Sequence, residues 1–221
     1  MVSLYGVFKR KEERVLTLYR VKLSTNVERV ALALAHKALK VESVWVPYED
    51  RTEIRRISGQ DLVPVLIDDG KVVIDSMEIV RYLEDRFPAT PPLYPRDPAR
   101  RADCLVLIDW FNRVWKRPPN DMEAELSKPE GQRDMRRVER LGRAMQGYLD
   151  LFEQMLTGRD YLLGDFSAAD IAAFPFLKYA TLHDPGDPHL FHKILVDYQK
   201  PGNSHPNVAS WIARVDKRPR V

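Results

Sequence analysis

Asp75 and Ser76 set a carboxylate beside a hydroxyl where the sequence predicts that a helix begins. The first N–H groups of a helix have no partner inside it and lie at the positive end of its dipole, so they attract anions. Asp75 can face an ammonium group, while the Ser76 hydroxyl and the helix N–H groups can bind a carboxylate. The pair is therefore a candidate site for a ligand that carries both charges, although capping the helix is the commoner role of such residues.

Val63 and Pro64 precede this helix start, with a predicted β-hairpin between them and it. The apolar run after Pro64 returns through Asp69-Gly70, a dipeptide typical of a tight hairpin turn. Because proline cannot donate to a strand ladder, we expect Pro64 at the entry of its strand rather than inside it.

Strand and helix patterns alternate around these residues. Residues 15–21 and 41–48 are rich in β-branched and aromatic side chains and predict strands. Helical spacing lies between them, and Thr25 with Glu28 predicts a capping box at its start. A strand, helix and strand in this order should form a parallel pair with a right-handed crossover. With the hairpin and its helix, the order βαβ-ββα predicts a compact mixed sheet, and the charged residues 49–61 should cross its surface.

Proline marks a change of organisation after Phe87. Residues 88–98 hold five of the 16 prolines, which predicts a stiff linker. Every later pattern is helical, over residues 99–115, 130–156, 167–180 and 207–219. The sequence therefore predicts an N-terminal extension over 1–15, an α/β domain over 16–88, a linker over 89–98 and an all-helical domain over 99–221.

Composition limits the kinds of partner. A net charge of +3 over 221 residues argues against nucleic acid. The single cysteine, Cys104, excludes an internal disulfide framework and suits a reducing compartment, and it is expected in the core rather than as a nucleophile. No apolar run approaches 18 residues, and the start of the chain lacks a secretory signal. We therefore expect a cytoplasmic protein with no membrane partner.

Three motifs make the chain resemble a cytosolic glutathione transferase. They are Val63-Pro64 followed by the hairpin and Asp75-Ser76, the stretch "LLGDFSAADIAAFPFL", and the ending "HPNVASWIARVDKRP". The resemblance spans all but roughly the first fifteen residues. It implies an α/β thioredoxin-like N-terminal domain, an all-α C-terminal domain and a homodimer in which the first domain of each subunit packs on the second domain of the other.

The resemblance also implies that glutathione is the co-substrate. Pro64 would take the cis form, and the backbone N–H and C=O of Val63 would pair with the cysteine part of glutathione. Asp75 and Ser76 would receive its γ-glutamyl end. The family usually has Gln or Lys before this valine, whereas this chain has Leu62, so one polar contact would be missing.

Ser24 lies where the family resemblance places the catalytic residue. The stretch "STNVERV" resembles the helix start of the serine-type classes, phi above all and zeta less closely. Only a thiolate attacks electrophiles, and a free thiol with a pKa of about 8.5 is only about 3% ionised at pH 7. A hydroxyl donor and a helix N-terminus can together lower that pKa. The alternative is that Ser24 only caps the helix, or that Thr25 caps it and Ser24 has no role.

Two regions leave alternatives open. A positive residue should meet the glycine carboxylate of glutathione, and the spacing does not choose among Arg51, Arg55 and Arg56. Four of the five histidines fall within residues 183–205, in no standard zinc pattern, so no metal is predicted. That segment is interpreted as a surface excursion or as a wall of the second-substrate pocket. Four aromatic residues are further candidates for the pocket, with core packing favoured for most of them: Trp110, Phe111, Trp115 and Tyr179.

The sequence thus predicts a glutathione transferase that activates the thiolate for attack on a small hydrophobic electrophile. One alternative is a non-catalytic member of the family kept for dimerisation or partner binding. Another is a zeta-like glutathione-dependent isomerase, but the zeta signature has a cysteine two positions after its serine, and this chain has Asn26 there.

Overall fold

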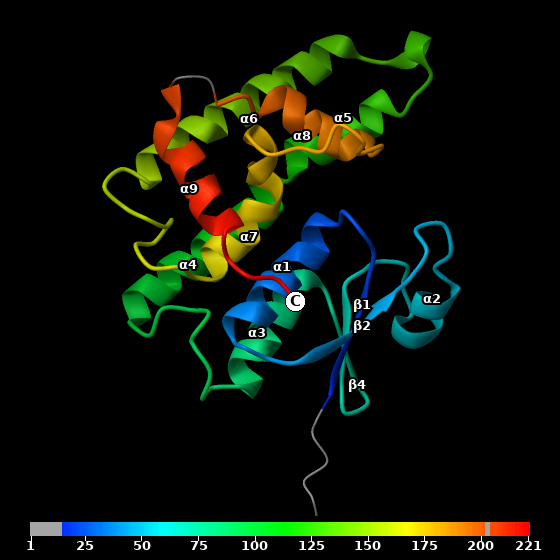
Figure 1. Cartoon of the computed structure of the whole chain (residues 1–221). Coiled ribbons are helices and arrows are strands. Elements are labelled where there is room, and N and C mark those ends of the chain that lie inside the picture. The colour runs from blue at the N-terminus through cyan, green and yellow to red at the C-terminus, as the bar shows by residue number, and fades with distance from the viewer. Residues whose placement is uncertain (1–14, 202–203) are drawn as a thin grey trace, which may run out of the picture.

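The computed structural model describes residues 15–201 and 204–221 and shows a sheet domain beside a larger group of helices (Figure 1). The extension predicted over 1–15 lies outside the described residues except for Val15, which is exposed just before the first strand. Of the helices within the described ranges, none combines the length and hydrophobicity that a membrane span requires.

A four-stranded mixed sheet forms the centre of the first domain. Its strands are β1 (Leu16–Arg20), β2 (Val41–Trp45), β3 (Val65–Asp68) and β4 (Lys71–Ile74), in the order β2-β1-β3-β4. Strand β1 pairs parallel with β2 and antiparallel with β3, and β3 pairs antiparallel with β4. Asp69 and Gly70 join the last two strands with positive φ angles of 51° and 79°, as the tight turn requires. The predicted βαβ-ββα order and mixed sheet are confirmed.

Three helices accompany the sheet: α1 (Thr25–His36), α2 (Thr52–Ser58) and α3 (Ser76–Arg86). Helices α1 and α3 lie on the side of the sheet that faces the helical domain, and α2 lies on the other side (Figure 1). Helix α2 corrects the prediction that residues 49–61 only cross the surface. It is short and buries one residue, Ile54, and this is too little apolar periodicity to predict a helix.

The second domain contains α4 (Pro98–Trp110), α5 (Arg117–Leu126), α6 (Met135–Met155), α7 (Ala168–Leu177), α8 (Leu190–Tyr198) and α9 (Pro206–Asp216). Pro98, predicted to end the linker, is instead the first residue of α4, because Asp97 caps the helix by accepting from the Arg100 N–H at 2.9 Å. The single helix predicted over 99–115 also changes character, since a π-helical turn over Phe111–Trp115 follows α4. Such turns recur at functional sites.

Helix α7 is the centre of the second domain, and every residue from Ala168 to Leu177 is buried. Its predicted start is confirmed, because Ser167 and Asp170 form a capping box. Asp170 also accepts hydrogen bonds from the Leu162 N–H at 3.0 Å and from Trp211 Nε1 at 2.8 Å. One buried carboxylate thus holds the loop before α7, the start of α7 and helix α9 together.

Residues 183–205 are not simply a surface excursion. They include helix α8, which buries Ile194 and Leu195 in the core, and His192 and His205 are also buried. The prolines and glycines that suggested a loop lie on either side of this helix rather than within it.

We expect Gly142→Ala to destabilise the helical domain. A Cβ at this position of α6 would lie far inside van der Waals contact of the Tyr198 ring from α8, and such overpacking costs about 1–3 kcal/mol. Gly147→Ala is the matched control on the same helix, because nothing lies within 4 Å of its Cβ position, and it should stabilise by about 0.5–1 kcal/mol. Urea unfolding of both variants measures the difference, and a neutral Gly142→Ala would contradict the packing.

Candidate functional site

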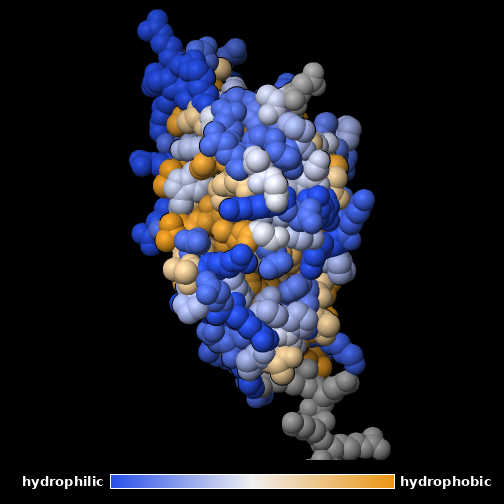
Figure 2. Space-filling view, turned by 90° about the vertical axis from the view of Figure 1, so that its left-hand side faces the viewer, coloured by the Kyte–Doolittle hydropathy of each residue, from blue (hydrophilic) through white to orange (hydrophobic). Residues whose placement is uncertain are grey.

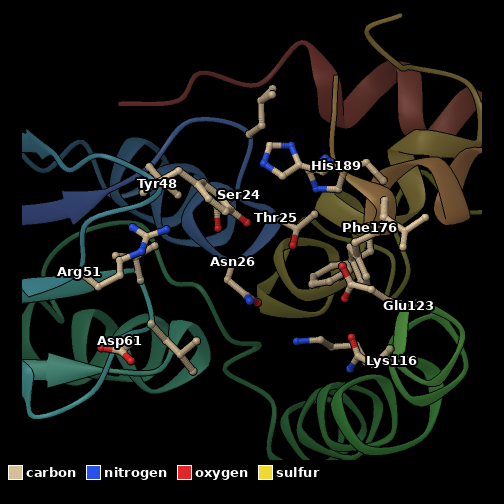
Figure 3. Close-up of a pocket in the computed structure, with 18 residues that line it drawn as sticks. Ser24, Thr25, Asn26, Tyr48, Arg51, Asp61, Lys116, Glu123, Phe176 and His189 are labelled. Carbon is tan, nitrogen blue, oxygen red and sulfur yellow. The ribbon is translucent and has the colours of Figure 1, made fainter. Parts of the chain in front are cut away.

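Two adjoining cavities of about 360 Å³ and 420 Å³ lie between the sheet domain and the helical domain. Asn26, Leu62, Val63 and Lys116 line both of them, so they form one continuous groove. The smaller cavity opens among Ser24, Tyr48 and Arg51 of the first domain and residues of the second domain (Figure 3). It is called the first cavity below, and its neighbour the second cavity.

Ser24 is the N-cap of α1 and lines the first cavity. Its hydroxyl oxygen accepts from the Val27 N–H at 3.3 Å, and its own O–H, which has no acceptor within residues 15–201 and 204–221, can donate to a ligand. The capping box predicted for Thr25 and Glu28 is wrong. With Ser24 as N-cap, Glu28 falls one position too late for a box, and it pairs instead with Lys178 at 2.5 Å and with Arg220.

Asp75 and Ser76 line the second cavity together with Val63 and Pro64. Asp75 does cap α3, because its Oδ1 accepts from the N–H groups of Met77 and Glu78, at 2.8 Å and 3.2 Å. Ser76 does not cap the helix, and its hydroxyl lies near Arg29 and Asn26. The structure therefore brings all four predicted binding residues to one cavity, next to the cavity that Ser24 lines.

The segment that enters β3 is fixed by a local pair of hydrogen bonds. The Gln60 side chain donates to the Leu62 C=O at 2.8 Å and accepts from the Leu62 N–H at 2.5 Å. The Val63–Pro64 peptide bond that follows is cis, and both residues face the second cavity. Leu62 itself is 74% exposed at the rim of the groove.

Backbone conformations that non-glycine residues rarely adopt occur at both helix starts. Leu23, which precedes Ser24, has a φ of 58°, and Asp75 has a φ of 66°. Such conformations persist only where the surrounding structure enforces them, and they concentrate at ligand-binding and catalytic sites.

Arg29 lies in the stretch "STNVERV" that carried the family resemblance, but the sequence analysis assigned it no role. It is 1% exposed, and its Nε and Nη2 donate to the Ala172 C=O of α7 at 2.9 Å and 2.6 Å. Its Nη1 donates to Ser76 Oγ at 3.3 Å, and its guanidinium lies 4.7 Å from the centre of the Phe176 ring. Burial lowers the pKa of Arg29 to about 9, against the opposing effect of the Asp75 charge. The Arg29 guanidinium therefore connects the two domains and contacts Ser76, which lines the second cavity.

Lys116 is a second residue that sequence reasoning missed. It follows the π-helical turn, and its ammonium lies 4.9 Å from the centre of the Phe176 ring. Burial and the charge of Arg29 lower the pKa of Lys116 to about 8, although the charge of Asp75 opposes them. Within the described ranges its side chain has no hydrogen bond and no carboxylate partner. The one signal in the sequence was a lysine directly after an aromatic helical segment.

Among the three arginines that the sequence could not separate, Arg51 lines the groove. Its Nη1 is buried and has no hydrogen-bond partner among residues 15–201 and 204–221, and its guanidinium lies 4.9 Å from the centre of the Tyr48 ring. Arg55 Nε forms an exposed ion pair with Asp61 Oδ1 at 2.6 Å. Arg56 lines neither cavity.

The candidate pocket aromatics lie elsewhere. Phe111, Trp115 and Tyr179 are buried in the core and Trp110 packs against it, and none of the four lines either cavity. Phe176 and Phe191 provide the aromatic surface of the first cavity instead. Cys104 is fully buried, and burial raises the pKa of its thiol to about 11, which agrees with a core residue.

The segment after residue 183 does form a wall of the first cavity, which was one of its two predicted roles. It contributes His189, Leu190, Phe191 and His192. Glu123 of α5 lies on the same side of the groove as His189 (Figure 3).

Comparison with known proteins decides the family. A profile described as the N-terminal domain of glutathione S-transferase matches residues 18–91, and one described as the C-terminal domain matches residues 136–214. The chain belongs to the glutathione S-transferase family. Protein LigF of Sphingobium sp. is 27% identical over 93% of this chain and 91% of its own length. FtsZ-localized protein A of Caulobacter vibrioides is 30% identical over 73% of this chain and 75% of its own.

Solved structures show the same fold. The structure of the β-etherase LigF has a TM-score of 0.74 at 24% identity and covers 92% of this chain and 96% of its own. Poplar glutathione transferase F1 has a TM-score of 0.71 at 23% identity, with 92% of both chains covered. A theta-class transferase from Xanthomonas axonopodis pv. citri, solved with glutathione bound, has a TM-score of 0.67 at 26% identity and covers 92% of this chain and 93% of its own.

We expect Arg29→Lys to destabilise this glutathione transferase family member more than Arg29→Met. Lysine keeps a buried charge but cannot donate to Ala172 and Ser76 together, and an uncompensated buried charge costs about 3–5 kcal/mol. Methionine removes that charge and fills a similar volume. Arg81→Lys is the control, because the Arg81–Glu78 pair on α3 is exposed and should change stability by less than about 1 kcal/mol. Urea unfolding ranks the variants, and a well-tolerated lysine would show that the forked guanidinium does not join the domains.

Proposed function

We propose that this protein is a glutathione transferase that binds glutathione in the second cavity and presents its thiol to Ser24. One observation carries the proposal. Ser24 caps α1 with its O–H free, directly beside a cavity lined by Val63, Pro64, Asp75 and Ser76. The family membership and the glutathione-bound theta-class relative support the same ligand.

The groove offers a partner to each part of the tripeptide. The backbone of Val63 faces the cysteine part, and Asp75, which uses one carboxylate oxygen to cap α3, faces the α-ammonium. The Ser76 hydroxyl and the first N–H groups of α3 bind the γ-glutamyl carboxylate. Arg51 meets the glycine carboxylate, because its buried Nη1 otherwise has no partner in the described part of the chain.

The charge around the sulfur favours the thiolate. The N-terminus of α1 carries a partial positive charge, and a hydroxyl donor binds a charged sulfur more strongly than a neutral one. Lys116 lines both cavities and adds a cation near their junction. Lowering a thiol pKa from about 8.5 to about 6.5 raises the thiolate fraction at pH 7 from about 3% to about three-quarters. Attack on an electrophile in the first cavity can then proceed at neutral pH.

Two other functions remain as alternatives. Zeta-class transferase Z1 of Arabidopsis thaliana is 36% identical, but only over 41% of this chain, and Asn26 stands where the zeta signature has a cysteine. A non-catalytic role has support in a relative named for its localisation to FtsZ. Retention on glutathione-agarose, with turnover of 1-chloro-2,4-dinitrobenzene, separates the transferase from a binding protein that does not use glutathione. The expected cytoplasmic location stays a prediction.

We expect Ser24→Ala to lower turnover of 1-chloro-2,4-dinitrobenzene by about tenfold or more at pH 7. Losing a hydrogen bond of about 1.5–3 kcal/mol to the thiolate raises the bound thiol pKa by roughly one to two units. Glutathione affinity should change only a fewfold, because the contacts to the peptide remain. The pH–rate profile should shift to higher pH, and activity should partly recover near pH 9, as steady-state kinetics and calorimetry can measure.

Asp75→Asn serves as the complementary variant. It keeps an oxygen that can cap α3 but loses the charge for the α-ammonium, so it should weaken glutathione binding and leave the pH–rate profile in place. If Ser24→Ala instead leaves both rate and pH profile unchanged, the thiolate is stabilised by other groups, and the serine-type assignment is wrong.

We also propose that the protein is a homodimer, which rests on the family architecture. Figure 2 shows hydrophobic surface flanked by hydrophilic residues on the side of the molecule that carries α4. On that helix Val106 is 69% exposed and Leu105 is also exposed, and contiguous exposed apolar surface marks an interaction site. The arginines from Arg96 to Arg101 lie at the start of the same helix.

Sedimentation equilibrium at micromolar concentration should give twice the chain mass, and Val106→Glu should shift it to the mass of one chain. A buried charge without a partner costs several kcal/mol in an interface. Leu151→Glu on α6 is the control for adding a charge to an exposed apolar position and should leave the dimer intact. A wild-type mass of one chain would refute the assembly.

A further inference from the structure

Asp187 holds two imidazole rings at the wall of the first cavity. Its Oδ1 lies 2.7 Å from His189 Nδ1 and its Oδ2 lies 2.6 Å from His192 Nδ1. The His189 backbone N–H also donates to Oδ1, at 3.0 Å. These separations are those of hydrogen bonds, so each histidine carries a proton on Nδ1 and directs its Nε2 away from the carboxylate.

The carboxylate keeps its charge in this arrangement. Burial alone would raise the pKa of Asp187, but the hydrogen bonds from His189 and His192 outweigh it and hold that pKa below its ordinary value. A charged carboxylate behind an imidazole fixes the ring and stabilises the imidazolium form, which is how such a pair serves in proton transfer.

The two rings differ in their access to the cavity. The His192 side chain is 8% exposed and its ring stacks on Tyr179 at a centroid distance of 4.6 Å. Burial lowers the pKa of His192, and the charge of Lys178 acts in the same direction. The His189 side chain is 24% exposed and projects into the cavity (Figure 3). His189 is therefore the ring that a substrate can reach.

Further groups face His189 from other elements. The Tyr48 ring lies 4.9 Å from the His189 ring, and Arg51 lies behind that tyrosine. Glu123 comes from α5, and burial raises the pKa of its carboxyl against the opposing charge of His189. Lys116 lines the same cavity. Ser24 comes from the first domain and His189 from the second, and both line the first cavity (Figure 3). A substrate bound in that cavity can therefore meet both the thiolate and the imidazole.

We propose that His189 is a proton donor to the second substrate and that the first cavity takes electrophiles whose leaving group is an oxygen. This inference rests on the proposed glutathione transferase function. A halide leaves as a stable anion and needs no proton. An alkoxide or phenoxide is far more basic, so its departure is accelerated by a general acid, by a factor of about 10²–10⁴.

The step balances without any further reagent. Glutathione loses its thiol proton to solvent when it binds as the thiolate. Its sulfur forms a bond to the substrate carbon while the carbon–oxygen bond breaks and its electron pair moves to oxygen. The proton on His189 Nε2 passes to that oxygen and gives an alcohol or phenol. His189 is left neutral, with Nδ1–H still bonded to Asp187, and regains a proton from solvent.

A matched series of substrates tests this role. Wild type and variants are assayed with 4-nitrobenzyl chloride and with 4-nitrobenzyl ethers of phenols of decreasing acidity, from 4-nitrophenol to phenol. For His189→Gln we expect kcat/KM on the phenol ether to fall at least tenfold further than on the chloride. This loss of ether cleavage should become smaller as the leaving phenol becomes more acidic. Ether cleavage should decline at alkaline pH in the wild type but not in His189→Gln.

Two further variants complete the design. Asp187 orients His189 and does not itself contact the substrate. Asp187→Asn should therefore lose kcat/KM with the same dependence on the leaving group, but by a smaller factor. His183→Gln changes an exposed histidine of the same segment that lines neither cavity, and it should match wild type on every substrate.

The outcomes separate this inference from the proposed function. If the wild type neither binds glutathione nor uses the chloride, the proposed function fails. If it uses the chloride but cleaves no ether, or if His189→Gln loses the same factor on all substrates, the proton-donor role is refuted. The three side chains could also hold a metal, since their ligand atoms lie within 4.8 Å of one another. Stoichiometric zinc in the purified protein, lost in His192→Gln, would likewise overturn the proposal.

Discussion

The buried guanidinium of Arg29 is the contact on which the site depends. Arg29 rises from α1 of the sheet domain, donates twice to a backbone oxygen of the central helix α7, and reaches Ser76 at the start of α3. Desolvating a cation is costly, so the fold must keep these acceptors and the Phe176 ring in place around it. The same side chain therefore joins α1 to α7 and contacts the Ser76 hydroxyl that is proposed to bind glutathione.

Both helix starts at the groove have a capping residue that is also proposed to contact glutathione. Ser24 accepts one backbone N–H and Asp75 accepts two, yet each retains a function that the cap does not use, a free O–H in one case and a carboxylate oxygen in the other. Capping and binding are thus compatible here, because the cap orients the side chain at the positive end of the helix where an anion would lie. Leu23 and Asp75, at these two helix starts, have positive φ angles, and both line the groove.

The helical domain contributes ionisable side chains to the first cavity. Lys116, Glu123 and His189 all line it, beside Phe176 and Leu190. Burial lowers the pKa of Lys116 and raises that of Glu123, so both groups are held toward their neutral forms. Perturbed groups of this kind gather where a protein handles charge during binding or reaction. In the proposed function, the first domain binds glutathione and the second domain contributes most of the surface that faces the electrophile.

The sequence by itself determined the strands and the hairpin of the first domain and the start of α3, because these signals are local, whereas the glutathione-binding roles came from the family resemblance. A turn dipeptide, a proline before a strand and polar residues at helix starts each specify the conformation of their own neighbourhood. It also determined the buried start of α7, where Ser167 and Asp170 are three residues apart. The choice of Arg51 over its neighbours, the roles of Arg29 and Lys116, and the meeting of Asp187 with His189 beside Tyr48 were decided only by the tertiary structure. Those residues are joined by burial and by contacts between distant segments, and a pattern of spacing along one chain carries no information about which surfaces meet.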